Sequence, residues 1–423
     1  MRHPIVAGLT GLVLAAAAAA CSGGSSSGSG TSTITLWHGY TDAEAKAITS
    51  LAQKWNGEHP KQQVHLIFNG GNDGALQKTL ASFVSGKTPN IGYEYGSSIT
   101  TLAQRHQTQD LTSLVNSTAG FNWNDFFPAE RQATTVNGKI YGVPALVDNL
   151  ALVYNKKLFD AKHIPYPTAN WTWDDFRNAA RKLADPAAKK YGWSFTNDGT
   201  EDTVWRYLAL LWQAGGDLLS PDGHKSAFDS PAGLQAMQLL HDMAVTDKSV
   251  YLDTGDQQYQ QLFNSGRIGM LWTGPWDLGS FDQVQYGVQF LPGKVTHATI
   301  SGPDNYMLFG AGGKKQPAWA FLQWLVSPQV HLEFATATGD LPIRQSETKL
   351  PGYSAFLAKY PGNKVFMDNL TTNATKARPN IPQYPKISQV LGVAVQSVLL
   401  GKAQPQAALD SARDQIDQIL AGA

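Results

Sequence analysis

The sequence predicts an α/β protein built from two domains, and two observations lead to this class. The chain has 423 residues, whereas a single hydrophobic core stops growing at about 250 to 300 residues. Residues 34–95 alternate short apolar strands with amphipathic helices, which is the pattern of a parallel sheet covered by helices. We therefore expect a parallel sheet in the first domain and a second core farther along the chain.

The N-terminal segment predicts export and attachment to a membrane. Residues 5–20 are apolar, with the length of a signal peptide core and too short for a typical membrane span. Cys21 is the single cysteine, and the Gly- and Ser-rich residues after it have the composition of a flexible coil. The sequence AAAC that ends at Cys21 resembles a bacterial lipoprotein signal, which implies a signal peptide at 1–20 and a lipidated cysteine with its tether at 21–33. A secretory signal with a free thiol is the alternative, and both place the protein outside the cytoplasm.

Three strands and two helices follow in order. The apolar stretches at 34–37, 64–68 and 91–95 have the length and composition of buried strands. Between them, Thr41 and Glu44 have the spacing of a capping box at the start of the first helix, and residues 76–84 form the second helix. This βαβαβ order predicts the parallel sheet.

Polar residues follow each of these strands. In open α/β sheets, ligands bind at the loops that leave the carboxyl ends of the strands. Those loops carry hydroxyl, amide, imidazole and carboxylate groups. The residues that we expect to contact a ligand here are His38, Gly39, Asn72, Asp73, Ser97 and Ser98.

The later part of the chain continues the alternation of strands and helices in a less regular order. Residues 139–144 and 149–155 are predicted to be extended, and a short helix follows. Thr172 and Asp175 have capping-box spacing, which makes Trp173 a packing residue at a helix start. Further helices are predicted around 205–212 and after Ser230, where a proline occupies the first helical position.

Composition excludes several classes of function. The chain has 33 basic and 33 acidic residues with no basic run, which argues against a nucleic acid partner. One cysteine cannot form a multi-thiolate metal site, and the ten histidines include no H-E-x-x-H motif. Gly86-Lys87-Thr88 resembles the end of a nucleotide-binding loop, but Ala81 replaces its first glycine and Pro89 follows it. We therefore expect neither a metal nor a cofactor.

The stretch QLFNSGRIGMLWTGPWDLGS at 261–280 resembles the signature of maltose-binding-type bacterial extracellular solute-binding proteins, family 1, which are receptors of carbohydrate ABC importers. Four shorter matches lie in the same order as in that family: ITLWHG at 34–39, LxxxYNK at 150–156, TWDD at 172–175 and PNIPQ at 379–383. Together they cover nearly all of the chain after the signal.

The resemblance implies a periplasmic-binding-protein-like fold of two discontinuous α/β lobes, joined by hinge segments, with a sugar in the cleft between them. Crossings between the lobes are expected near 147–149, 301–305 and 341–344. The N-terminal lobe would comprise 34–147 and 303–343, and the C-terminal lobe 148–302 and 344–423. The implied partners are a membrane permease with separate ATPase chains, the receptor itself being a monomer.

Sugar chemistry independently explains the residue types at these positions. A sugar ring presents an apolar face and a rim of hydroxyls, so it needs an aromatic platform and polar groups in the ring plane. Trp276, preceded by Gly274 in the signature, fits the platform. The polar groups that we expect around the sugar are Asp148, Asn149, Asn305 and Arg344, with Glu201 and Trp205 as further contacts from the second lobe.

Two other functions are compatible with parts of the sequence. A surface-anchored glycosidase would use paired carboxylates such as Asp174 and Asp175 or Glu201 and Asp202, although neighbours on a helix point in different directions. A receptor for glycerol phosphate or sugar phosphate would need several cationic or backbone N–H donors in the cleft. The charge of the cleft distinguishes this receptor from a sugar receptor.

Overall fold

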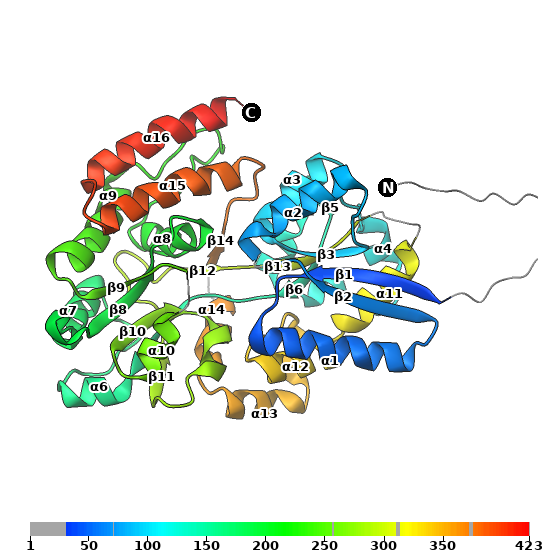
Figure 1. Ribbon diagram of the computed structural model, residues 1–423, viewed down its shortest axis with the longest axis horizontal. Helices are drawn as coiled ribbons and strands as arrows, with labels where there is room; N and C mark the ends of the chain where they lie inside the picture. Colours follow the sequence, from blue (N-terminus) through cyan, green and yellow to red (C-terminus); the bar gives the residue numbers. More distant parts are fainter. Residues whose placement is uncertain (1–30, 71, 256–257, 310–313, 372–374, 423) are drawn as a thin grey trace, which may run out of the picture.

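The computed structural model describes residues 31–70, 72–255, 258–309, 314–371 and 375–422, and the side chains of residues 72–74 lie outside this description. Two α/β lobes lie side by side (Figure 1), each built on a five-stranded sheet. The expected fold class is thereby confirmed. Cys21 and the signal segment lie outside the described residues.

The sheet of the first lobe has the strand order β2-β1-β3-β13-β6. Its strands are β1 (Ser32–His38), β2 (Gln62–Phe68), β3 (Ile91–Tyr95), β6 (Val143–Leu146) and β13 (Asp304–Leu308). Strand β1 pairs in parallel with both β2 and β3, as predicted, whereas β13 runs antiparallel to β3 and β6. A segment far along the chain therefore completes the first sheet.

Helices cover both faces of this sheet. They are α1 (Asp42–Glu58), α2 (Asn72–Ser85), α3 (Ile99–Gln104), α4 (Thr112–Ser117), α5 (Pro128–Ala133), α11 (Lys315–Leu325) and α12 (Pro328–Thr338), and β4 (Thr135–Val136) and β5 (Lys139–Ile140) form a small hairpin. The predicted capping box of α1 is only half formed: the Glu44 carboxylate accepts a hydrogen bond from the Thr41 backbone, but the Thr41 side chain makes no cap hydrogen bond. Asp42 has φ of +45°, so the backbone enters the helix in a conformation that a capping box does not use.

The sheet of the second lobe has the strand order β11-β7-β10-β8-β9. Its strands are β7 (Ala151–Asn155), β8 (Tyr191–Thr196), β9 (Val250–Asp253), β10 (Ile268–Thr273) and β11 (Tyr286–Gln289). The surrounding helices are α6 (Lys156–Ala161), α7 (Trp173–Leu183), α8 (Glu201–Gln213), α9 (Pro231–His241), α10 (Gln258–Asn264), α15 (Tyr384–Leu399) and α16 (Pro405–Ala421). The capping box of Thr172 and Asp175 is confirmed at the start of α7, and Trp173 is buried there.

Several backbone segments run between the lobes. Strands β12 (Thr299–Ser301) and β14 (Thr375–Ala377) pair in parallel, and Asn149 forms a bridge with Ser301 (Figure 1). Helices α13 (Gly352–Lys359) and α14 (Asn363–Thr371) precede β14. Arg344 still pairs with Phe126 of the first lobe, which favours a third crossing beyond residue 344. The lobe boundaries given above remain predictions.

Within the described ranges, the helices are all too short or too polar to span a bilayer.

Candidate ligand-binding site

The carboxyl ends of β1, β2, β3 and β6 face the second lobe (Figure 1). The region where the two lobes meet is called here the lobe junction. The 3-10 helix Gly96–Ser98 follows β3, and the Tyr95 ring before it lies 5.1 Å from the guanidinium carbon of Arg378, just after β14. The hydroxyl of Thr100 contacts the amide of Asn380. The ligand-binding edge predicted from the sequence is therefore an edge at which the lobes touch.

Five acidic side chains of the first lobe and of the adjoining crossing segment gather at this junction. This carboxylate cluster consists of Glu44, Glu130, Asp148, Asp304 and Asp340. Glu130, Asp340 and Asp304 are 0%, 1% and 5% exposed, and the other two are partly exposed. The charges of Asp340, Asp304 and Asp148 each raise the pKa of Glu44, and those of Asp148 and Asp304 raise the pKa of Glu130. The five groups are thus close enough to repel one another.

Burial and mutual repulsion raise the pKa values of the carboxyl groups in this cluster, so these groups keep their protons to a higher pH. Burial raises the pKa of Asp304 to about 7, against the opposing effects of Arg378 and of the hydrogen bond from Tyr93. Burial likewise raises the pKa of Asp340 to about 6, although the Thr338 hydroxyl and His331 lower it. These carboxyl groups therefore titrate close to neutral pH.

Asp148, predicted as a ligand contact, lies inside this cluster. Its Oδ1 accepts a hydrogen bond of 2.8 Å from the backbone N–H of Gly302. A Cβ atom on Gly302 would lie 2.6 Å from the same oxygen, so only glycine allows this close approach. The two crossing segments therefore fix the position of the Asp148 carboxylate.

Arg378 is a junction residue that the sequence reasoning missed. Its side chain is 6% exposed, and its Nη1 donates a hydrogen bond of 3.2 Å to Oε1 of Glu201. Tyr384 donates to the same oxygen at 2.9 Å, and Ser388 donates to the other oxygen of Glu201. Glu201, predicted as a sugar contact, thus has its carboxylate engaged in holding Arg378. The PNIPQ motif that begins at residue 379 was the signal that pointed to this segment.

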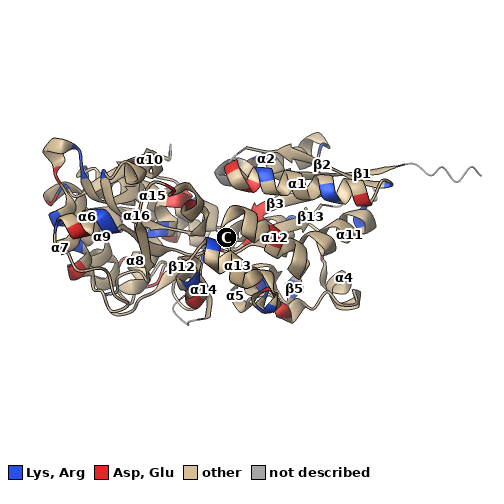
Figure 2. Ribbon diagram, turned by 90° about the horizontal axis from the view of Figure 1, so that it is seen from below, with Lys and Arg blue, Asp and Glu red and all other residues tan. Residues whose placement is uncertain are grey.

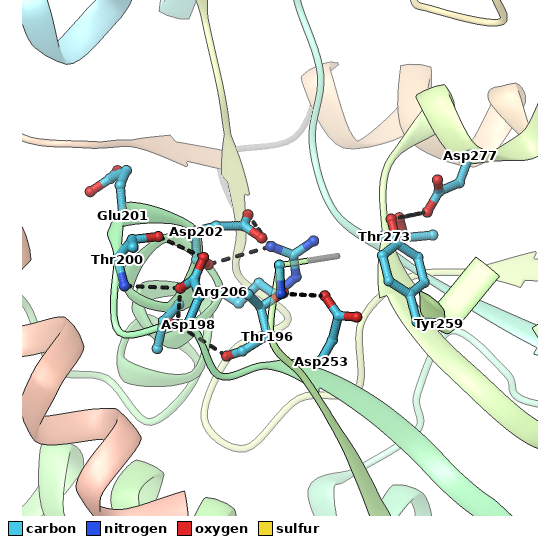
Figure 3. Close-up of polar contacts among 12 residues, drawn as sticks. Thr196, Asp198, Thr200, Glu201, Asp202, Arg206, Asp253, Tyr259, Thr273 and Asp277 are labelled. Carbon is cyan, nitrogen blue, oxygen red and sulfur yellow. Dashed lines mark hydrogen bonds and ion pairs between the residues drawn. The ribbon is translucent and has the colours of Figure 1, made fainter. Parts of the chain in front are cut away.

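The polar groups of the second lobe are paired with one another (Figure 3). Arg206 donates to the carboxylate of Asp202 four residues earlier. Asp277, which is fully buried, accepts hydrogen bonds from Tyr259 at 2.9 Å and from Gln260 at 2.6 Å, and also one from Thr273. These acids therefore have donors within their own lobe.

Two tryptophans lie beside these groups. Trp276 is partly exposed in the 3-10 helix Pro275–Ser280, and its ring lies 5.9 Å from that of the buried Trp205. A Cβ atom on Gly274 would lie 1.8 Å from Cζ3 of Trp276, so the indole rests directly on the glycine. The Gly-Pro-Trp part of the signature thus presents an aromatic ring at the carboxyl end of β10.

A second group of rings lies at the carboxyl ends of β1 and β2. His38 is 6% exposed and stacks on Tyr40 at 5.7 Å, while Phe68 lies 6.0 Å away on its other side. Burial lowers the pKa of His38, which favours the neutral imidazole. Phe68 is 57% exposed although it is aromatic, and the sequence reasoning missed it. Its signal was its place as the last residue of a predicted strand.

Arg344 and Asn149, which were predicted to contact the ligand, are hydrogen-bonded to other parts of the chain instead. The Arg344 guanidinium donates to the backbone oxygens of Val326 at 2.7 Å and Phe121 at 2.9 Å, and lies 3.7 Å from the Phe126 ring. It is a packing residue of the first lobe away from the junction. Asn149 donates to Phe366 O at 3.0 Å and accepts from Asn369 at 2.8 Å, so its amide fastens the crossing segments.

The remaining predicted contacts divide into three groups. Gly39, Ser97 and Ser98 are buried at the carboxyl ends of β1 and β3, where they were expected. Asn305 is fully buried within β13 and its amide donates to Pro303 O at 3.4 Å. Asn72 and Asp73 begin α2, but their side chains lie outside the described residues. In the part of the chain that the structure describes, no group of histidine and acidic side chains could hold a metal ion.

Comparisons with known proteins agree with this architecture. A protein of Brucella abortus, named only as a binding protein, is 29% identical over 302 residues, covering 68% of this chain and 69% of the relative. The sn-glycerol-3-phosphate-binding periplasmic protein of Pectobacterium atrosepticum is 24% identical over 414 residues, covering 92% and 91% of the two chains. The crystal structure of an ABC transporter solute-binding protein from Thermotoga lettingae, bound with α-D-tagatose, is 26% identical with a TM-score of 0.83, covering 92% and 100%.

The fold has two α/β lobes, and segments that follow their strands lie at the junction between them. This architecture is that of the two-lobed solute-binding receptors. The family model of bacterial extracellular solute-binding proteins matches residues 39–331, and the chain belongs to that family. Membership confirms the resemblance drawn from the sequence and places the working site of the chain outside the cytoplasm.

Proposed function

We propose that this chain is the substrate-binding component of an ABC importer and captures a sugar between its lobes. Two observations carry the proposal: the partly exposed indole of Trp276 rests on Gly274 at the carboxyl end of β10, and the carboxylate cluster lies at the lobe junction. An aromatic ring suits the apolar face of a sugar, and carboxylates accept hydrogen bonds from its hydroxyls. The Thermotoga lettingae relative, which has the same fold, was solved with a sugar.

The expected interaction energies suit a receptor of moderate affinity. Stacking that buries about 80 to 100 Å² of sugar face supplies about 2 to 2.5 kcal/mol. Hydrogen bonds to charged groups contribute about 1.5 to 3 kcal/mol each. A micromolar site requires about 8 kcal/mol in total, which one stack and three or four such bonds approach after the costs of binding.

A receptor for glycerol phosphate is the second candidate, favoured by the Pectobacterium relative. The charges at the junction argue against it. Arg378 and Arg206 are the cations described here, and they are paired with Glu201 and Asp202. A phosphate would meet the carboxylate cluster instead, and repulsion between like charges would weaken its binding.

A glycosidase is disfavoured by the same geometry. Asp175 accepts the hydrogen bonds of the capping box, and Glu201 is held by Arg378, Tyr384 and Ser388. Neither adjacent pair of carboxylates thus offers a free acid and a free base on opposite sides of a substrate. We therefore propose that the chain binds its sugar without turnover.

The proposed mechanism is closure of the lobes around the sugar. Contacts that the sugar makes with both lobes exist only in the closed form, so binding favours that form. A separate membrane permease, energised by separate ATPase chains, would receive the sugar from the closed receptor. We further propose that the receptor is a monomer, that Cys21 carries a lipid anchor, and that the lobes divide near residues 147–148, 302–303 and 343–344.

A calorimetric screen of the purified full-length chain against mono-, di- and oligosaccharides and glycerol phosphates tests the proposal. One sugar should bind saturably, raise the melting temperature and remain chemically unchanged. Trp276→Ala should weaken its binding about 30- to 60-fold, the equivalent of the stacking energy. Trp123→Ala, which removes a partly exposed indole of the first lobe, is the control and should leave affinity unchanged. Product release, or exclusive binding of glycerol phosphate, would overturn the proposal.

A further inference from the structure

At a pH above the pKa values of Asp304 and Asp340, about 7 and about 6, the carboxylate cluster carries more negative charge than the described residues around it compensate. Arg378 is the cation that acts on Asp148, Asp304 and Glu130, and its Nη1 is already hydrogen-bonded to Glu201 of the second lobe. His331, which acts electrostatically on Asp340, has its Nδ1 3.0 Å from Oε2 of Glu347. Both basic side chains are therefore shared with acids outside the cluster.

A second observation concerns hydrogen bonds and is independent of the charges. Several buried oxygens of the cluster have no hydrogen-bond partner: Oδ1 and Oδ2 of Asp340, Oδ1 of Asp304 and Oε2 of Glu130. All of them are acceptors, on side chains at least nine-tenths buried. Asp340 also raises the pKa of Glu44, Asp148 and Asp304 through its charge. Once these groups have lost their protons, their oxygens can only accept, so the missing partner is a group that donates.

Two acids of the second lobe are paired in a way that those of the cluster are not. There, Asp277 accepts three hydrogen bonds and Glu201 is satisfied by three donors. Leaving a buried acceptor unpaired costs about 1 to 3 kcal/mol. Several such acceptors close together in a native structure therefore call for a donor from outside the chain, such as a water, an ion or a ligand.

A metal ion and a neutral sugar fit these two observations less well. The described residues hold no group of side chains arranged to bind a metal ion. A neutral sugar supplies hydroxyl donors but leaves the excess negative charge in place. An ammonium group supplies donors and a compensating positive charge together.

We propose that the sugar captured by this chain carries an amino group, which binds as an ammonium among Asp340, Asp304 and Asp148. This inference rests on the proposed function and specifies its substrate class. The sugar ring lies against Trp276 of the second lobe, and the ammonium satisfies the unpaired oxygens of the first lobe. One ligand thus joins the two lobes with two different interactions.

Matched ligands test the inference on the full-length chain. Calorimetric titrations at pH 7.5 compare glucosamine with glucose, galactosamine with galactose, and the β-1,4-linked glucosamine disaccharide with cellobiose. The amino member of at least one pair should bind roughly tenfold tighter, as expected for replacing a neutral by a charged hydrogen bond. Raising the salt concentration should reduce the preference only slightly, because buried ion pairs are weakly screened.

Variants test whether the carboxylate cluster causes the preference for the amino sugar. Asp340→Asn should reduce the preference for the amino sugar to about twofold or less, because the amino sugar loses more affinity than its neutral partner. Asp304→Asn provides a second site for the same effect. Asp174→Asn, an exposed acid on α7, is the matched control and should leave the preference intact.

The outcomes separate the two proposals. Equal binding of both members of every pair would overturn this inference while leaving the chain a sugar receptor. A preference that persists in both Asn variants would also overturn it, because the ammonium would then bind elsewhere. Failure of every sugar to bind would overturn the proposed function together with it.

Discussion

Both lobes place acidic side chains at the same junction, but these acids differ in whether the chain itself supplies their hydrogen-bond donors. In the second lobe, Glu201, Asp202 and Asp277 each have a donor from the chain itself. In the first lobe, Asp340 and Asp304 are buried with unpaired oxygens. On the proposed function, the second lobe supplies an aromatic platform and acids that are already paired, whereas the acids of the first lobe would receive their donors from the ligand.

Removing the cation of the second lobe should have the largest effect. Arg378→Ala leaves Glu201 buried without its partner and should lower the free energy of unfolding by about 3 to 5 kcal/mol, measured by urea denaturation. The double variant with Glu201→Gln should recover part of this loss. Lys364→Ala breaks an exposed ion pair with Asp368 and should cost about 0.5 kcal/mol or less. If Arg378→Ala lowered the free energy of unfolding by no more than Lys364→Ala does, the comparison between the two lobes would be contradicted.

The first lobe should show the opposite response to charge removal. The pKa of Asp340 is about 6 in the folded chain and about 3.9 in an unfolded chain. Between these values the folded state keeps a proton that the unfolded state releases, so stability falls as the pH rises through this window. Asp340→Asn should therefore stabilise the ligand-free protein by up to about 3 kcal/mol at pH 8 and by almost nothing at pH 4. Destabilisation at pH 8 would show that the carboxylate already has partners within the chain.

A methyl group under the aromatic platform should weaken sugar binding without unfolding the lobe. Gly274 has φ of −107°, which alanine adopts readily, so the clash with Trp276 is the main effect of Gly274→Ala. Displacing the indole should reduce sugar affinity about tenfold, measured by calorimetry. Gly57→Ala in α1 meets no atom within 4 Å and should leave affinity unchanged. Equal affinities for both variants would remove Trp276 from the site.

The smallest expected effect compares two helix caps. Thr172→Ala in the second lobe removes the capping box of α7 and should cost about 1 kcal/mol of stability. Thr41→Ala in the first lobe removes no cap hydrogen bond and should cost almost none. Thermal denaturation of both variants measures the difference. Equal losses would mean that the Thr41 side chain caps α1 in solution.

The sequence predicted what depends on local patterns. The strands β1, β2 and β3 and the helices between them follow from the spacing of apolar residues, and the cap at Thr172 from two residues three positions apart. The cap at Thr41 has the same pattern and is only half formed because of the backbone at Asp42, which the pattern does not report. The family signature indicated the segment that presents Trp276.

The sequence did not predict which charged residues meet across the chain. Arg378 and Glu201 are far apart in sequence and pair only because the crossing at β14 returns beside α8 and α15. Arg344 lies near a predicted crossing, but its partners Phe121 and Val326 draw it into the first lobe. Side-chain partners of this kind depend on the packing of distant elements, so a single sequence cannot assign them.

The most direct test is a crystal structure of the chain with the sugar that the calorimetric screen identifies. The account predicts one sugar between the lobes, with a ring face on Trp276 and donors within hydrogen-bond distance of Asp340 or Asp304. A sugar bound elsewhere, or bound between the lobes without touching either group, would contradict it.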